Sequence, residues 1–329
     1  MKKRSSIWIL SLLVMVSWAF APLQKKKPFT IVLLPDTQNY AEKYPNIFRA
    51  QTTWVADKKN NITFVLQLGD ITNNNSPEQW HVAKEAFEIM DGKVPYSFVV
   101  GNHDIGTHGW TDTRNTNLFN QYLPYSKYSK MPNFGGAFED GKMDNTWYAF
   151  KAGGYDWLVL NLEFGPRNIV LDWANEVVRK HPKHKVIVNT HAYMYSDDKR
   201  ISVRHNHKWT PQSYGIGKDT GPNQVNDGED MWEKFVRKHK NIMFVFSGHV
   251  LNEGVGTLVS KGDHGNDVYQ MLANFQSGVI GSENGGNGFL RLITIDPKKK
   301  KVIVKTYSPY LDQYKQTPEH NFQFDNVAF

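Results

Sequence analysis

The sequence predicts an α/β protein that is built around two β-sheets. Short runs rich in Val, Ile and Phe alternate with helical stretches from residue 28 to residue 250, which is typical of a parallel sheet with helical crossovers. The segment from Val268 to Pro309 instead holds three strand-like runs in a row, which indicates a second, antiparallel or mixed sheet on the same core. No repeat or low-complexity linker interrupts residues 28–329, so we expect a single domain over residues 22–329.

Five of the apolar runs end on a polar residue, and this is the strongest functional signal in the chain. The runs are FTIVLLP, NITFVLQLG, YSFVVG, KVIVNT and NIMFVFSG, and they lead in turn into Asp36, Asp70, Asn102, His191 and His249. The carboxyl ends of parallel strands open onto the ligand crevice of a sheet. We therefore expect two carboxylates, one carboxamide and two imidazoles to meet at one rim.

Apolar periodicity and capping signals predict four helices and one hairpin. The helices are expected at 46–59, 77–91, 166–181 and 227–240. Ser76 is the expected cap of the second helix, with Pro77 at its first position. Asp227 is the expected cap of the fourth helix, with Asp230 three residues further on. The turn at 296–298 predicts a hairpin between the last two strands.

Two long segments, residues 105–147 and 196–226, interrupt the alternation of strands and helices. The first is rich in Asn, Gly and aromatic residues, and the second is polar with scattered cations. Loops of this length inside a compact domain are usually functional or disordered. Each begins just after a strand end that carries candidate ligands, so we expect both segments to contact the substrate.

The N-terminus carries the pattern of a secretory signal peptide. Three basic residues at positions 2–4 precede an apolar stretch from Ile7 to Val16, and Ala19-Phe20-Ala21 has the small-x-small form of a cleavage site. The stretch is short for a bilayer crossing, which takes roughly 20 residues. We expect cleavage after Ala21 and export to the periplasm or beyond; the alternative is an uncleaved anchor.

Composition limits the partners of the exported chain. Without residues 1–21 it has 36 basic and 32 acidic residues, so its formal charge falls from +7 to +4. This mild, evenly spread charge predicts no specific nucleic-acid partner and suits a small anionic substrate. The chain has no cysteine, which excludes disulfides and a lipid anchor on cysteine, and we expect no membrane span after cleavage.

The residue types at the strand ends suit a pair of divalent metal ions. A carboxylate such as Asp70 bridges two cations, and Gly69 before it allows backbone and metal to approach closely. Asn102 offers a neutral oxygen, and the two imidazoles suit Zn, Fe or Mn. Two metals about 3.5–4 Å apart hold the oxygens of a phosphoryl group in line. We expect His103 to face the leaving group and Asp104 to fix its tautomer.

Along the chain, the motifs follow one another in the order Asp36, Gly69-Asp70, Gly101-Asn102-His103-Asp104, His191 and Gly248-His249. This order resembles the calcineurin-like metallophosphoesterase superfamily, over the chain from Thr30 to Ser308. The resemblance implies a two-sheet sandwich flanked by helices, in four layers α/β/β/α, with a dinuclear metal site at the strand ends. It also implies direct attack of a metal-bound hydroxide on phosphorus, with Asp70 as the bridging ligand and His103 as the general acid or transition-state stabiliser.

Two motifs depart from the family pattern. The first usually ends in His but reads Asp36-Thr37-Gln38 here, and the last is usually Gly-His-x-His but reads Gly248-His249-Val250-Leu251. The resemblance assigns both missing histidines to the metal that Asp36 holds. Gln38 still offers a carboxamide oxygen, and Asn252 lies one residue beyond the second missing histidine.

From these departures we expect two different metal sites. The site of Asp36 and Gln38 is rich in oxygen and favours Mn, Mg or Ca, whereas the His-rich site favours Mn, Fe or Zn. The alternative is that the Asp36 site is weak or empty. The segments LPDTQNY, LEFGPR and NTHAY resemble a subgroup of exported bacterial members that carries Asp-Thr-Gln in the first motif.

Arg167, His205 and His207 are candidate substrate-binding residues outside the metal shell. Arg167 follows another strand end, where it either clamps a phosphate or pairs with Glu163. The two histidines belong to a cationic stretch at 200–208, which either binds an anionic substrate or is a solvated part of its loop.

Together these features predict an exported, metal-dependent phosphoesterase that hydrolyses small phosphomonoesters or phosphodiesters. One alternative is a strict phosphodiesterase, which a comparison of monoester and diester turnover would identify. Another is a noncatalytic protein that binds phosphate or a glycan through a single metal, which tight metal binding without turnover would identify. The pair His103-Asp104 favours an enzyme, because a binding protein has no use for a positioned proton donor.

Overall fold

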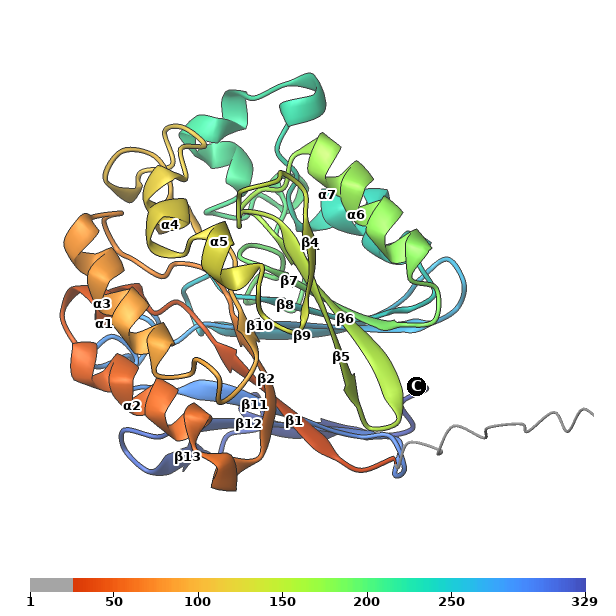
Figure 1. The fold of residues 1–329 in the computed structure, drawn as a ribbon. Coiled ribbons are helices and arrows are strands. Elements are labelled where there is room, and N and C mark those ends of the chain that lie inside the picture. Colours follow the sequence, from red (N-terminus) through yellow and green to blue (C-terminus); the bar gives the residue numbers. More distant parts are fainter. Residues whose placement is uncertain (1–25) are drawn as a thin grey trace, which may run out of the picture.

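The computed structural model describes residues 26–329, which form two packed sheets with helices outside them (Figure 1). The predicted signal peptide at 1–21 lies outside the described residues. In spatial order, the first sheet contains β13 (Gln313–Lys315), β12 (Lys301–Ser308), β11 (Leu290–Asp296), β1 (Phe29–Leu34), β2 (Ile62–Gln67) and β3 (Tyr96–Ser97), and β14 (Asn321–Phe324) also pairs with β12. The strands β1, β2 and β3 are parallel, whereas β11 and β12 are antiparallel to their neighbours.

The second sheet is also mixed. In spatial order it contains β4 (Phe134–Ala137), β5 (Thr146–Ala152), β6 (Tyr155–Leu162), β7 (Lys185–Thr190), β8 (Ile242–Ser247), β10 (Asp267–Ala273) and β9 (Val255–Lys261). The central strands β6, β7, β8 and β10 are parallel, and antiparallel strands lie at both edges.

Helices cover the outer faces of the two sheets. The first sheet is covered by α1 (Gln38–Glu42), α2 (Pro45–Ala56) and α3 (Pro77–Glu88), and the second by α6 (Asn168–Lys180) and α7 (Gly228–Lys234) (Figure 1). The short helices α4 (Asn117–Tyr122) and α5 (Tyr125–Tyr128) belong to the first long segment. The order of layers is therefore α/β/β/α, which confirms the predicted fold class.

The central strands are apolar on both faces because each face packs against a different layer. In β1, Ile31 and Leu33 point toward the second sheet, whereas Val32 and Leu34 pack against α2 and α3. The same alternation occurs in β8, where Phe244 lies between the sheets. Strands buried on both faces read as continuous apolar runs, which is the pattern that the sequence shows.

The predicted helix starts lie within two residues of the observed ones, but three predicted ends lie too far along the chain, since α2 ends at Ala56, α3 at Glu88 and α7 at Lys234. Ser76 accepts a hydrogen bond from the backbone of Gln79 (3.4 Å), and Asp227 forms a capping box with Asp230. The helix α7 ends at Lys234 instead of residue 240, because the backbone leaves helical geometry at Phe235 (φ −139°) and continues as a short 3-10 turn.

The sequence predicted that the strands of the tail form a second sheet of their own, and this prediction is wrong. The tail strands are divided between the two sheets. The run VYQMLANFQ becomes β10 and pairs parallel with β8, since it is buried on both faces like its neighbour. The strands β11 and β12 join β1 instead, and they form the predicted hairpin. Asp296 stabilises that turn by accepting hydrogen bonds from the backbone of Lys298 (3.1 Å) and Lys299 (3.0 Å).

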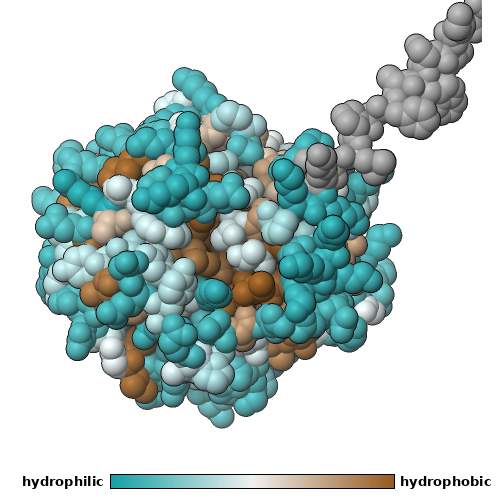
Figure 2. All heavy atoms as spheres, turned by 90° about the horizontal axis from the view of Figure 1, so that it is seen from below, coloured by the Kyte–Doolittle hydropathy of each residue, from teal (hydrophilic) through white to brown (hydrophobic). Residues whose placement is uncertain are grey.

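The face seen from below is covered mostly by hydrophilic side chains, and hydrophobic atoms gather in a hollow near its centre (Figure 2). Within residues 26–329, no helix combines the length and the apolar character that a bilayer crossing requires.

Candidate metal centre

All five predicted strand-end residues lie near one another, but they come from both sheets and not from one. Asp36, Asp70 and Asn102 follow β1, β2 and β3, whereas His191 and His249 follow β7 and β8. The backbone is left-handed at Asp36 (φ 41°), Asp70 (φ 49°) and His249 (φ 78°). Strained conformations of this kind cost about 1–3 kcal/mol each and cluster at functional sites. The left-handed backbone at these three residues therefore indicates that the strand ends form a functional site.

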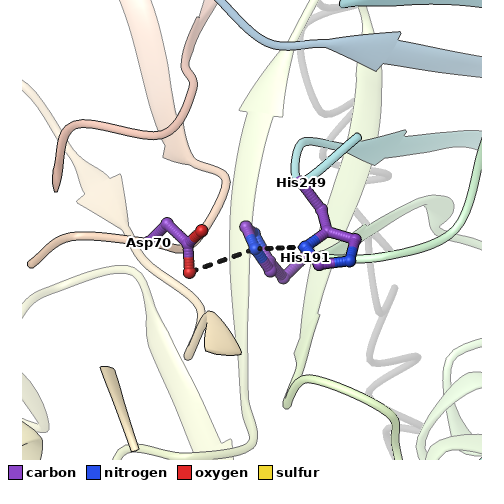
Figure 3. Close-up of side chains that lie close together, drawn as sticks. All are labelled: Asp70, His191 and His249. Atoms are coloured by element: carbon purple, nitrogen blue, oxygen red, sulfur yellow. Dashed lines mark hydrogen bonds and ion pairs between the residues drawn. The ribbon is translucent and has the colours of Figure 1, made fainter. Parts of the chain in front are cut away.

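We call Asp70, Asn102, His191 and His249 the histidine half of the centre. The ligand atoms of Asp70, His191 and His249 lie within 4.8 Å of one another, and all three residues are buried (Figure 3). His191 Nε2 lies 3.2 Å from Asp70 Oδ1 and 3.1 Å from Asn102 Oδ1. It also lies 3.2 Å from His249 Nδ1.

Backbone carbonyls orient both imidazoles of the histidine half. His191 Nδ1 lies 2.7 Å from Leu68 O, and His249 Nε2 lies 2.7 Å from Trp209 O. These nitrogens carry the protons that they donate, so in the neutral rings His191 Nε2 and His249 Nδ1 turn lone pairs toward each other. Together with Asp70 Oδ1 and Asn102 Oδ1 these nitrogens make four ligand atoms that converge on one buried place, which a divalent metal can occupy instead of a proton on His191 Nε2. This arrangement fits a divalent metal, and carbonyl-oriented imidazoles are typical around one.

The negative charge of Asp70 in the histidine half also favours a cation beside it. Burial disfavours a charged His191, but the charge and hydrogen bond of Asp70 outweigh burial and raise the pKa of His191 to about 9. Burial lowers the pKa of His249 to about 3, and the positive charge of His191 adds to this effect. Burial also opposes ionisation of Asp70, yet His191 and His103 outweigh it and hold the pKa of Asp70 well below its usual range. An anionic Asp70 therefore keeps one positive charge beside it.

We call Asp36, Thr37 and Gln38, which follow β1, the oxygen half of the centre. All three are buried, and Asp36 Oδ2, Thr37 Oγ1 and Gln38 Oε1 have no hydrogen-bond partner within residues 26–329. Gln38 Nε2 donates to Asp70 Oδ2 (3.2 Å), and the backbone N–H of His249 donates to Asp36 Oδ1 (2.9 Å). Burial raises the pKa of Asp36 well above its usual value. Buried polar atoms are rarely unpartnered, so three in succession fit a cation that prefers oxygen.

Gln276 belongs beside the oxygen half, and the sequence analysis missed it. This buried residue follows β10, and its Nε2 lies 3.4 Å from Asp36 Oδ1. The signal was the same as at the other strands, because Gln276 is a polar residue at the end of an apolar run. Asn252 instead donates to Ser196 Oγ (2.9 Å), and no hydrogen bond between Asn252 and Asp36 occurs in the described part of the chain.

His103 lies next to the centre with one ring nitrogen engaged. Its Nδ1 lies 2.8 Å from the carbonyl oxygen of Asn73, and its backbone N–H donates to Asp70 Oδ1 (2.9 Å). The half-buried ring is therefore held by a carbonyl, with the proton on Nδ1 and Nε2 free for exchange with a ligand.

Asp104 does not fix the tautomer of His103, so that expectation is wrong. Its buried carboxylate instead accepts hydrogen bonds from the backbone N–H groups of Ile71 (3.1 Å), Thr72 (2.8 Å) and Gly101 (2.9 Å). Burial and the negative charge of Asp70 raise the pKa of Asp104 to about 6, against the effect of these donors. Asp104 joins the loop after β2 to the loop after β3, and so positions Asp70 and His103 together.

Aromatic residues and the second long segment enclose the histidine half. Trp209, whose backbone is left-handed (φ 61°), supplies the carbonyl that orients His249. Phe164, which follows β6, packs with its ring centroid 5.2 Å from that of His249. Tyr214 meets Phe164 edge-on at 5.2 Å and lies 6.1 Å from His249. Burial and the charge of Asp70 raise the pKa of the Tyr214 hydroxyl above its usual value.

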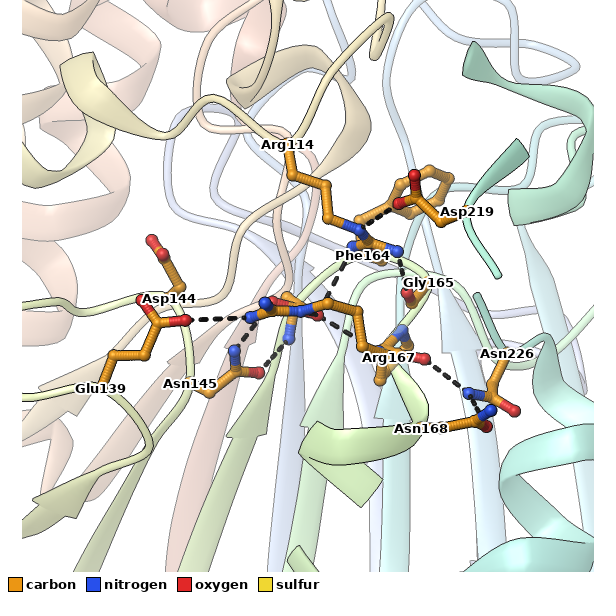
Figure 4. A network of polar contacts seen from close by, with 12 residues as sticks. Arg114, Glu139, Asp144, Asn145, Phe164, Gly165, Arg167, Asn168, Asp219 and Asn226 are labelled. Atoms are coloured by element: carbon orange, nitrogen blue, oxygen red, sulfur yellow. Dashed lines mark hydrogen bonds and ion pairs between the residues drawn. The ribbon is translucent and has the colours of Figure 1, made fainter. Parts of the chain in front are cut away.

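Arg167 lies in a network of polar contacts that also includes Arg114 and Glu139 (Figure 4). Its guanidinium binds both carboxylate oxygens of Glu163 (2.8 and 3.1 Å) and reaches Glu139 (3.4 Å). Arg114 approaches the same Glu163 (3.4 Å) and pairs with Asp219 (2.8 Å). Of the two roles expected for Arg167, the structure shows the ion pair with Glu163, and the guanidinium is occupied by carboxylates.

His205 and His207 are placed by contacts inside their own loop. The ring of His207 stacks on Tyr195 with a centroid separation of 3.9 Å, and its Nε2 lies 3.3 Å from Asp197. His205 is exposed and lies 3.8 Å from Glu229. Within residues 26–329, no hydrogen bond or ion pair joins either histidine to the metal centre, and their predicted contact with the substrate stays a prediction.

Comparison with known proteins gives three findings. Residues 29–253 match the family model described as calcineurin-like phosphoesterase. The chain is 31% identical over 294 residues to the uncharacterized protein YvnB of Bacillus subtilis (strain 168), which covers 87% of this chain but 20% of the relative, so the chain spans about a fifth of that protein. A purple acid phosphatase, PPD1 from seeds of yellow lupin (Lupinus luteus), has a similar fold, with a TM-score of 0.56 at 14% identity over 93% of this chain and 55% of that one. At this identity the likeness concerns the fold alone.

Proposed function

Because the chain belongs to the calcineurin-like phosphoesterase family, we propose that it hydrolyses phosphoric esters with divalent metal ions held by the histidine half and the oxygen half. The family assignment confirms the predicted superfamily, and it supports the proposed reaction class, that of a phosphoester hydrolase. The observation that carries the proposal for this chain is the convergence of four ligand atoms, from Asp70, Asn102, His191 and His249, on one buried place.

Asp70 is suited to bridge two metals, because its two oxygens face different halves. Oδ1 lies against His191, and Oδ2 accepts the hydrogen bond from Gln38. When bound, the metals would supply the positive charge that stabilises a phosphoryl group during hydrolysis. The remaining ligands would be Asn102, His191 and His249 in the histidine half, and the orphaned oxygens of Asp36 and Gln38 in the oxygen half.

His103 is suited to act as the general acid. Its Nδ1 proton is held by the carbonyl of Asn73, so a second proton on the imidazolium resides on Nε2. Transfer of that proton to the leaving oxygen would neutralise the charge that develops as the ester bond breaks. Asp104 supports this role indirectly, since it joins the loops of Asp70 and His103.

The identity of the metals follows from the donor atoms. Two imidazoles suit Mn, Fe or Zn in the histidine half, whereas carboxylate, hydroxyl and carboxamide oxygens suit Mn, Mg or Ca in the oxygen half. The proposed substrates are small phosphomonoesters or phosphodiesters. The N-terminal pattern at residues 1–21 further supports the proposal that the protein is exported to the periplasm or beyond.

Hydrolysis of a chromogenic phosphomonoester and its diester tests the proposal. The purified protein would be stripped with a chelator and then given Mn, Mg, Ca, Fe or Zn singly. We expect turnover to disappear on chelation and to return with Mn, which suits both halves. Silence with every metal, together with one tightly bound ion per chain, would refute the hydrolase and support a metal-dependent binding protein. The mass of the mature protein recovered from outside the cytoplasm tests cleavage after Ala21.

A further inference from the structure

The ring of Tyr214 lies beside the candidate metal centre, and the ligand sets described above do not use its phenol. Its ring packs edge-on against Phe164 and beside His249, and its side chain is only half buried. Burial raises the pKa of this phenol, and the negative charge of Asp70 adds to the effect. Within residues 26–329, this hydroxyl makes no hydrogen bond. Because the side chain is only half buried, a hydroxyl without a protein partner there is open to a ligand beside the candidate metal centre.

The backbone around Tyr214 is fixed relative to the centre. The N–H of Ile216 donates to the carbonyl oxygen of Thr111 (3.3 Å), and the hydroxyl of Thr111 donates to the carbonyl oxygen of Asn102 (2.5 Å). Gly215 lies so close to Asp112 that a Cβ there would come within 2.6 Å of its Cα. The two long segments are therefore clasped together at this point, and Tyr214 is anchored through them to a residue of the histidine half.

We propose that Tyr214 is a further catalytic residue, whose hydroxyl donates a hydrogen bond to a nonbridging phosphoryl oxygen of the substrate. This inference rests on the proposed function. The phenol complements His103, because His103 serves the leaving oxygen whereas Tyr214 serves an oxygen that stays on phosphorus. A donor fixed in place before the reaction stabilises the negative charge that the phosphoryl oxygens carry in the transition state.

The substitution Tyr214→Phe removes the hydroxyl and keeps the ring that packs on Phe164. Donors to charged oxygens contribute strongly, so we expect kcat/KM for a chromogenic phosphomonoester to fall roughly 10- to 100-fold. The affinity of the Mn-loaded protein for inorganic phosphate, measured by calorimetry, should fall roughly tenfold. Bound metal per chain and the thermal midpoint should stay at wild-type values. Tyr310→Phe, at an exposed tyrosine outside the centre, is the matched control and should change neither quantity.

Unchanged kcat/KM and unchanged phosphate affinity in Tyr214→Phe would overturn the proposal. In that case Tyr214→Ala, which also removes the ring, would show the effect of packing alone. Loss of bound metal in Tyr214→Phe would also count against it, because the tyrosine would then act on the metals. If the wild-type protein hydrolyses no ester with any metal, the proposed function fails. The calorimetric comparison with inorganic phosphate then still decides whether the hydroxyl binds a phosphoryl oxygen.

Discussion

The two halves of the metal centre solve the problem of buried polar atoms in opposite ways. In the histidine half, each imidazole has its outer nitrogen on a carbonyl and its inner nitrogen turned to the other ligands. In the oxygen half, three consecutive side chains each leave one buried oxygen without a partner. In the histidine half, both nitrogens of each imidazole already contact protein atoms before a cation binds. In the oxygen half, the three unpartnered oxygens are satisfied only when a cation binds. We therefore infer that this half selects which metal is bound.

Removing the residue shared by both halves should have the largest effect. In Asp70→Asn the negative charge that both metals would share is lost, so we expect turnover to fall by roughly 10⁴-fold and bound metal to fall at both positions. Elemental analysis and hydrolysis of a chromogenic ester measure the two effects. Asp263→Asn, at a surface ion pair with Arg237, is the control. Retention of one full equivalent of tightly bound metal would show that the halves are independent.

Substituting His103 should separate proton donation from metal binding. His103→Asn removes the imidazole and keeps a polar side chain, and we expect kcat to fall about 100- to 1000-fold, as for loss of a general acid. The metal content of both halves should not change, because the contacts of the His103 ring are to Asn73 and not to the metal ligands. Esters with better leaving groups should be less affected. An equal loss for all leaving groups would argue against proton donation.

Substitution of Gln38 should change both the rate of hydrolysis and the metal that the oxygen half prefers. Gln38→Ala removes both the orphaned oxygen and the hydrogen bond to Asp70, and we expect a loss of roughly 10- to 100-fold in activity or metal affinity. Gln38→His restores the residue usual in the family and should shift the preferred metal toward Zn. Reactivation with single metals after chelation measures both. An unaltered metal order in Gln38→His would contradict the assignment of selectivity to this half.

The smallest effect is expected at Gln276. Its hydrogen bond to Asp36 is long, at 3.4 Å, and Asp36 also accepts from the backbone of His249. We therefore expect Gln276→Ala to lower turnover only about threefold, with a weaker affinity for the metal of the oxygen half. Titration of the chelated protein with Mn would show this as a change in the weaker of two binding steps. A change in the tighter step would place Gln276 in the other half.

The fold and the ligands were predictable where the signal is local. An apolar run that ends on a polar residue marks Asp36, Asp70, Asn102, His191 and His249, and the structure brings all five together. The assignment of strands to sheets was not predictable, because pairing depends on partners far away in sequence. The run that became β10 reads like any strand, yet its neighbour is β8 and not β11.

The roles of loop residues were harder to predict for the same reason. Asp104 follows His103 directly, but its hydrogen bonds go to the backbone of the preceding loop. The tautomer of His103 is set by the backbone carbonyl of Asn73. Every residue has such a carbonyl, so the residue type at position 73 could not predict this contact. Trp209 supplies a carbonyl to His249 and Tyr214 packs beside it, and both lie on the second long segment, whose path in space could not be read from the sequence.

The pairing of β1 with β11 has a consequence for the order of folding. Phe29 faces Ile295 across this ladder, and the hydroxyls of Thr30 and Thr294 lie 2.9 Å apart, so the two ends of the chain build one sheet. Contacts between such distant residues form late, because the chain loses the entropy of closing a large loop before the contacts stabilise it. During synthesis, β1 therefore stays an open edge until residues near 290 emerge. The proposed export would benefit from this delay, because β1 cannot pair with β11 until the residues near 290 have also crossed the membrane.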